Sequence, residues 1–146
     1  MEIIYNDANV IAALQRLHDR VGNIRPALAE IGEAMTESTK HRFETLTKPE
    51  GGDWKDNSFV TITNKGHIRP LTGKSGELMD SIDYQLDGAF AVGIGSNKDQ
   101  AAMMQFGGTK DEFPHLWGDI PARPFLGISA EDKAVILDII ERHLHL

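Results

Sequence analysis

Apolar residues recur at helical spacing near the N-terminus of the chain. Four of them are separated by four, three and four residues: Val10, Leu14, Leu17 and Val21. This spacing places them on one face of an α-helix. Asn6 or Asp7 offers a cap at its start, and Gly22 stands where glycine commonly ends a helix. The pattern predicts a first helix from about Ala8 to Arg20.

A longer apolar series follows, with a charged face opposite to it. The apolar positions are Ile24, Leu28, Ile31, Met35, Phe43 and Leu46. The charged positions are Glu30, Glu33, Glu37, Lys40 and Glu44. Asn23 is the expected cap, and Pro26 is tolerated in a first helical turn. The sequence therefore predicts its longest helix from Arg25 to about Thr45, which is roughly 30 Å long.

Residues 81–95 change to the alternation of a β-strand. Their apolar positions are Ile82, Tyr84, Leu86, Phe90, Val92 and Ile94. Asp87-Gly88 favours a two-residue turn between two antiparallel strands. We therefore expect a β-hairpin over about 81–95, preceded by a turn and a short helical segment capped by Ser75.

Two more helices are expected in the second half of the chain. Asn97 offers a cap for a helix that reaches about Phe106. Ser129 begins the last helix, and Asp132, three residues later, completes a carboxylate variant of the capping box. The apolar face of this last helix is expected to consist of Val135, Ile136, Ile139, Ile140 and Leu144.

The segment from Thr47 to Pro70 has no helical period and contains one short predicted strand, Phe59–Thr63. A loop of this length, rich in glycine and polar residues, predicts the most mobile part of the isolated protein. Trp54 lies at its start. That side chain is either a binding aromatic or an anchor to the core. The anchor is favoured, because burying an aromatic side chain stabilises a fold by ~2 to 3 kcal/mol.

These elements predict an α+β fold. The apolar face of the 81–95 hairpin must be covered, and the longest amphipathic helix is the obvious cover. We expect one domain over 1–146. It contains an antiparallel β-sheet packed against the long helix, N- and C-terminal helices, and a flexible loop at about 47–70.

Composition excludes several classes of function. The chain has 146 residues, 40% of them hydrophobic and 25% charged, which is typical of a soluble globular protein. It has no apolar run long enough to span a bilayer, and its first residues lack the basic region of a signal peptide. The absence of cysteine excludes disulfides, thiolate metal sites and cysteine catalysis. A net charge of −7 counts against nonspecific DNA binding.

Catalysis and cofactor binding have no positive support in the sequence. Gly93-Ile94-Gly95 follows a predicted strand, but the third glycine of a phosphate loop is missing and the hairpin is antiparallel. None of the six histidines stands four residues from another on one helix beside a carboxylate. No nucleophile elbow is present. We therefore expect no catalytic residues, no metal site and no cofactor.

The stretch from Gln105 to Gly127 is the most constrained part of the chain. It contains three of the six prolines, Pro114, Pro121 and Pro124. Because proline fixes φ and restricts the preceding residue, Arg123 and Phe125 are held in a set geometry. An ordinary proline-rich connection is the alternative. The sequence does not separate an Arg123 that pairs within the domain from one that reaches a neighbouring chain.

Several of these motifs together resemble the tailed-bacteriophage virion morphogenesis family, the Mu-like tail completion group. They are Leu71-Thr72-Gly73, Gly76 to Ile82, Val92 to Gly95, Gln105-Phe106-Gly107-Gly108, and Ile120 to Ser129 with Asp132; Trp54 also fits. The resemblance spans about residues 25–143. One departure is the run Gln100 to Met104, where such proteins often carry a Tyr-Ala pair and a histidine.

The resemblance implies a non-enzymatic structural protein for tail completion or head–tail joining, found in the virion and assembled in the cytoplasm of the host bacterium. It implies other tail or neck proteins as partners and a homo-oligomeric ring. Neither a membrane nor DNA is expected as a partner. The motif residues expected to serve fold or assembly are Trp54, Gln105, Phe106, Gly107, Gly108, Pro121, Arg123, Pro124 and Phe125. A small nucleotide- or phosphate-binding protein using the Gly93–Asn97 turn is the alternative.

Overall fold

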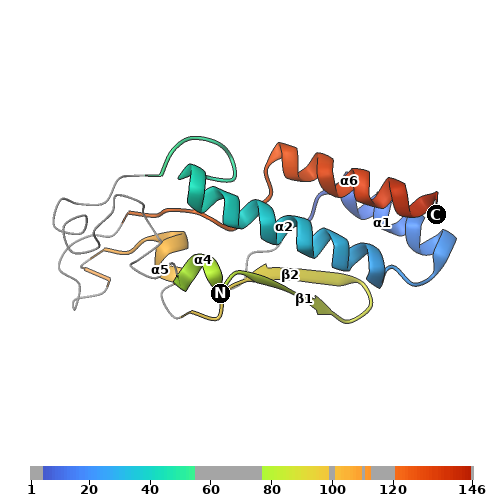
Figure 1. Ribbon diagram of the computed structural model, residues 1–146, viewed down its shortest axis with the longest axis horizontal. Coiled ribbons are helices and arrows are strands. Elements are labelled where there is room, and N and C mark those ends of the chain that lie inside the picture. Colours follow the sequence, from blue (N-terminus) through green and yellow to red (C-terminus); the bar gives the residue numbers. More distant parts are fainter. Residues whose placement is uncertain (1–4, 55–76, 99–100, 110, 113–120, 146) are drawn as a thin grey trace.

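A computed structural model describes residues 5–54, 77–98, 101–109, 111–112 and 121–145, and Figure 1 shows their arrangement. In chain order the elements are α1 (Ala8–Val21), α2 (Arg25–Thr45), α4 (Glu77–Asp80), β1 (Asp83–Asp87), β2 (Ala91–Gly95), α5 (Ala101–Phe106) and α6 (Ala130–Leu144). Helices and an antiparallel sheet together make an α+β fold, as the sequence predicts. No helix in these ranges is long and apolar enough to cross a membrane.

The first two helices lie within a residue of their predicted limits. The Asp7 carboxylate caps α1 by accepting from the N–H groups of Asn9 and Val10. The start of α2 differs from expectation. Ile24 occupies the cap position and supplies no side-chain bond, whereas Asn23, the predicted cap, accepts from the Arg25 N–H.

The β1–β2 hairpin pairs Asp83 with Gly95 and Asp87 with Ala91. This register leaves three residues in the turn, 88–90, so the prediction of a two-residue turn is wrong. Gly88 begins the turn at a φ of +65°, a conformation that glycine adopts at little cost. Phe90 consequently belongs to the turn and is 65% exposed, and the expectation that it lies on the covered apolar face is wrong.

Helix α2 covers one face of this sheet, as predicted, and contacts both strands. Figure 1 shows α2 between the hairpin and the neighbouring helices α1 and α6. The main core joins α1, α2 and α6, with three of its larger members on α2: Leu28, Ile31 and Met35. A second apolar cluster lies at the C-terminal end of α2 and consists of Phe43, Trp54, Leu78, Ile82, Ala101 and Phe125.

Helix α6 begins at the predicted capping box, in which both reciprocal bonds between Ser129 and Asp132 are present. Its buried face consists of Ile136, Ile139, Ile140 and Leu144. Val135 was expected on that face but is 43% exposed. At about 100° per residue, the buried side chains follow one another around the helix in the order Ile139, Ile136, Ile140 and Leu144, and Val135 lies before Ile139 at the edge of this face.

Parts of several predictions fall outside the described residues. They are the strand at 59–63, the cap at Ser75 and the mobility of the loop beyond Trp54. The described start of that loop, 47–54, forms a tight turn in which Thr47 bridges Asp53. Helix α5 begins at Ala101, later than the cap at Asn97 implies, and ends at Phe106 as predicted.

Helix α2 approaches the sheet closely at Gly32. A Cβ atom built on Gly32 would lie 2.5 Å from Cδ2 and 2.9 Å from Cβ of Tyr84. Because the Cβ of Tyr84 is fixed by the backbone of β1, rotating the ring cannot relieve the overlap. The spacing between helix and hairpin therefore depends on glycine, which has no side chain, at position 32.

The variant Gly32→Ala should lower the free energy of unfolding by roughly 1–3 kcal/mol, the usual cost of overpacking. This loss is expected although alanine favours a helix by about 1 kcal/mol over glycine. Urea unfolding measures the change. In the double variant Gly32→Ala/Tyr84→Ala the two effects should be less than additive, because the overlaps with the Tyr84 ring atoms are removed and only the one with its Cβ remains. A stabilised Gly32→Ala protein would contradict the packing described.

Candidate assembly site

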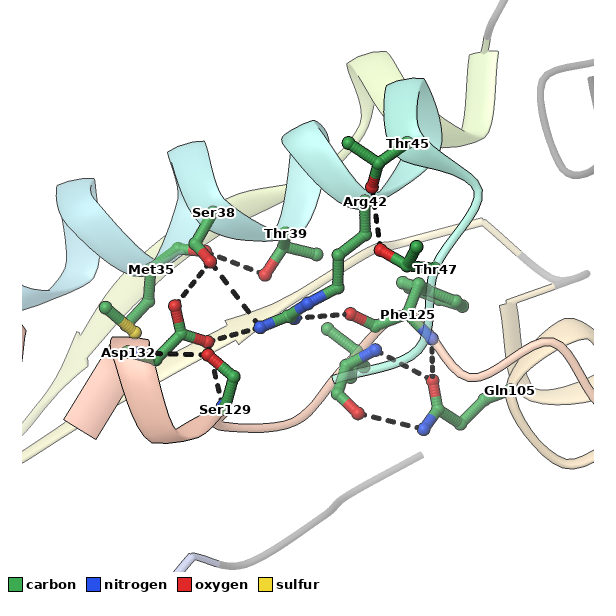
Figure 2. A network of polar contacts seen from close by, with 11 residues as sticks. Met35, Ser38, Thr39, Arg42, Thr45, Thr47, Gln105, Phe125, Ser129 and Asp132 are labelled. Atoms are coloured by element: carbon green, nitrogen blue, oxygen red, sulfur yellow. Dashed lines mark hydrogen bonds and ion pairs between the residues drawn. The ribbon is translucent and has the colours of Figure 1, made fainter. Parts of the chain in front are cut away.

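Residues 121–127, in the second part of the Gln105–Gly127 stretch, meet two other segments beside the C-terminal half of α2. These are the turn at 47–54 and the end of α5. Figure 2 shows polar side chains of α2 and α5 that reach the backbone around Phe125, and Asp132 at the start of α6 beside Arg42. The motif residues thus gather in one place, although up to 70 residues separate them in the chain, as between Trp54 and Pro124.

Phe125 is the apolar centre of this site. It is fully buried, and its ring centroid lies 5.5 Å from that of Phe43. Phe43 in turn makes an edge-on contact with Trp54, with centroids 5.4 Å apart. Three rings from three segments therefore pack as a chain, in geometries that aromatic pairs prefer.

Trp54 ties the turn at 47–54 to the proline-containing stretch. Its indole Nε1–H donates to the Pro124 carbonyl at 2.7 Å, and its backbone N–H donates to the Leu46 carbonyl at 2.7 Å. The side chain is buried. Of the two roles considered for Trp54, the geometry corresponds to the anchor.

Gln105 holds the stretch from the side of α5. Its Oε1 accepts from the N–H groups of Phe125 at 3.0 Å and Leu126 at 2.9 Å, and its Nε2 donates to the Leu126 carbonyl at 3.0 Å. The side-chain amide offers the donor and acceptor that a neighbouring strand would offer. A buried segment without a strand partner is thereby satisfied, which buried backbone requires.

The end of α5 is fixed by two backbone bonds. Gly107 donates to the Met103 carbonyl and Arg123 donates to the Met104 carbonyl, each at 2.7 Å. Arg123 is 7% exposed and its side chain is engaged in an interaction. Gly107, Gly108, Pro121 and Pro124 are half-buried, whereas Phe106 is exposed.

A buried ion pair, not foreseen from the sequence, joins this site to α6. The Arg42 guanidinium contacts the Asp132 carboxylate and donates from Nη1 to the Phe125 carbonyl at 2.8 Å. Asp132 also accepts from the Ser38 hydroxyl and, at 3.0 Å, from the Ser129 N–H. Figure 2 shows the guanidinium between the carboxylate and the carbonyl. The sequence does indicate that Arg42 is buried, because this residue lies seven positions after Met35 and therefore on the apolar stripe of the helix.

Chemically, this arrangement is a framework of buried contacts. In the described ranges, no three histidine or acidic residues are grouped to hold a metal ion. Gly93 and Gly95, considered as a phosphate-binding turn, lie within β2 and pair with Gln85 and Asp83. What the site does is fix the backbone from Met103 to Gly107 and from Arg123 to Leu126.

Comparison with known proteins agrees with the motifs. The phage virion morphogenesis family matches residues 5–145. The chain belongs to this family. It is 30% identical to the putative capsid assembly protein G of Escherichia phage Mu, over 94% of each chain. It is 31% identical to the Mu-like prophage FluMu G protein 2 of Haemophilus influenzae, over 100% of this chain and 97% of the relative. No solved structure matches.

Because it belongs to the virion morphogenesis family, this protein has a structural role in virion assembly. Its partners are other phage structural proteins.

Proposed function

We propose that this morphogenesis protein acts in tail completion or head–tail joining, without enzymatic activity. It functions as a homo-oligomeric ring in the virion, after assembly in the host cytoplasm. The proposal rests on one observation. The motif residues hold the backbone of residues 124–126 in place. The motif residues Gln105 and Trp54, together with Arg42 of α2, each bond to a main-chain carbonyl of residues 124–126. A protein that must present one surface reproducibly to several partners needs such rigidity.

The buried motif residues, in this proposal, serve the fold of each subunit. Phe125 is fully buried and Arg123 is 7% exposed, so neither offers a surface to a neighbour in the folded chain. We infer that Arg123 stabilises its own subunit. Contacts with partners are then made by the outward-facing residues of the same segments.

Electron microscopy of particles from a phage or prophage that lacks the gene tests the proposed function. Tails that are unfinished, or heads and tails that fail to join, are the expected products. A second candidate is a role in the head, because the Mu relative is named a putative capsid assembly protein. Malformed heads would favour that role. Normal, infectious particles would overturn both.

A further inference from the structure

The described apolar side chains form two clusters that share no buried member. The main core joins α1, α2 and α6, and the second cluster joins the end of α2 to the turn at 47–54, α4 and α5. Among the described side chains, only the partly buried Ile94 packs against both clusters. Figure 1 shows α1 and α6 beside α2, with α4 and α5 toward the other end of the molecule. The two clusters therefore follow one another along α2.

A buried polar layer lies between the two clusters on α2. Met35 belongs to the main core and Phe43 to the second cluster. Thr39 and Arg42 come between them and are buried, and Arg42 is paired with Asp132 at the start of α6. The Thr39 hydroxyl donates to the Met35 carbonyl at 2.7 Å. Figure 2 shows Thr39 and Arg42 between Met35 and Phe125, which is the centre of the second cluster.

This polar layer holds the two clusters together less strongly than apolar packing would. Separating two apolar surfaces exposes both of them to water, at a cost proportional to their area. Separation along the layer instead returns Arg42 and Asp132 to water, and the desolvation cost of such a buried pair is comparable to its gain. Each cluster is therefore stabilised mainly by its own contacts, and small domains open in cooperative units of this kind.

We propose that the second cluster opens as one unit along the polar layer while the main core stays folded. In the closed form Trp54, Gln105 and Arg42 hold the carbonyls of residues 124–126. Opening releases these three bonds together, because they join the parts of one cluster. The motif segment is thus set free without unfolding of the whole subunit. This conformational step is a property of the isolated chain and goes beyond the proposed function.

Amide hydrogen exchange in increasing urea tests the opening. The second-cluster set of amides consists of Phe43, Trp54 and Arg123, the last two bonded to the carbonyls of Leu46 and Met104. These three should share one opening free energy and one urea dependence. The main-core set, the amides from 28 to 35 in α2, should show a higher free energy and a steeper urea dependence, because the slope scales with the surface exposed. Protection should therefore fall in a step within α2, between Met35 and Phe43.

A matched pair of substitutions distinguishes two units from one. Ile82 of the second cluster is 2% exposed and Ile140 of the main core is 1% exposed. Replacing a buried isoleucine with valine changes an unfolding equilibrium by about two- to twelvefold. Ile82→Val should lower the protection of both sets by a common factor in this range, because it destabilises the closed form relative to every open form. Ile140→Val should lower only the main-core set, because Ile140 stays packed when the second cluster opens.

Two results would overturn the inference. If Ile140→Val lowers the second-cluster set as much as the main-core set, the chain opens as a single unit. If Ile82→Val leaves the second-cluster set unchanged, its amides exchange through separate local fluctuations. Both variants keep every charge and every polar group, and circular dichroism should show the wild-type helix content. Neither result affects the proposed function, which is tested on particles that lack the gene.

Discussion

Phe125→Ala should lower the free energy of unfolding by roughly 3–5 kcal/mol, the usual cost of truncating a buried phenylalanine. The side chain is fully buried, and its removal leaves Phe43 without one of its two ring neighbours. The Pro124 and Phe125 carbonyls fix the surrounding segment, so little collapse can fill the cavity. Urea unfolding at neutral pH measures the loss.

Phe106→Ala is the matched control for this prediction. It removes the same atoms 19 residues earlier in the chain, at a site that is 59% exposed. Its cost should stay within about 0.5 kcal/mol, as for surface substitutions. Equal losses for the two variants would contradict the opposite orientations of these phenylalanines.

Asp132→Ala should lower the free energy of unfolding by a similar amount, roughly 3–5 kcal/mol, because it leaves a buried guanidinium without its counter-charge. The Arg42 and Asp132 side chains are only 6% and 7% exposed. The same substitution also removes half of the capping box of α6. Urea unfolding again measures the loss, and circular dichroism reports whether the first turn of α6 frays.

Asp138→Ala, in the same helix, provides the control. Asp138 pairs with Arg142 at 3.3 Å, but its side chain is 71% exposed. Such surface pairs contribute about 0–1 kcal/mol. Replacing the buried pair together, as Arg42→Met/Asp132→Leu, should recover much of the loss, because no lone charge remains. An Asp132→Ala protein as stable as Asp138→Ala would show that the buried pair is not needed.

The helices could be predicted because their signals are local. The limits of α2 follow from an apolar stripe, and the start of α6 follows from a Ser129–Asp132 capping box four residues long. The hairpin was predicted from strict alternation. Its turn was not, because the register that places Phe90 in the turn is set by the pairing of Asp87 with Ala91 rather than by Asp87-Gly88 alone.

The contacts that hold the site around Phe125 could not be predicted, because their partners are distant in the chain. Arg42 and Asp132 are 90 residues apart. The place of Arg42 on the apolar stripe indicates burial but does not indicate its partner, and Asp132 already has a local role in the cap of α6. Gly32 likewise has no local reason to be glycine until Tyr84 is packed on it. The proline-containing motif indicated a rigid segment, but only tertiary packing decides that Phe125 turns inward while Phe106 turns outward.

The hydrogen bonds of Gln105 to Phe125 and Leu126 depend on a single atom of its side chain. Glutamate has the same shape as glutamine, with an oxygen in place of the side-chain nitrogen. At position 105 that oxygen would face the Leu126 carbonyl, which now accepts a hydrogen bond from the nitrogen at 3.0 Å. Two acceptors would then oppose each other in a buried site. Deamidation of this one side chain would therefore loosen the segment that it holds.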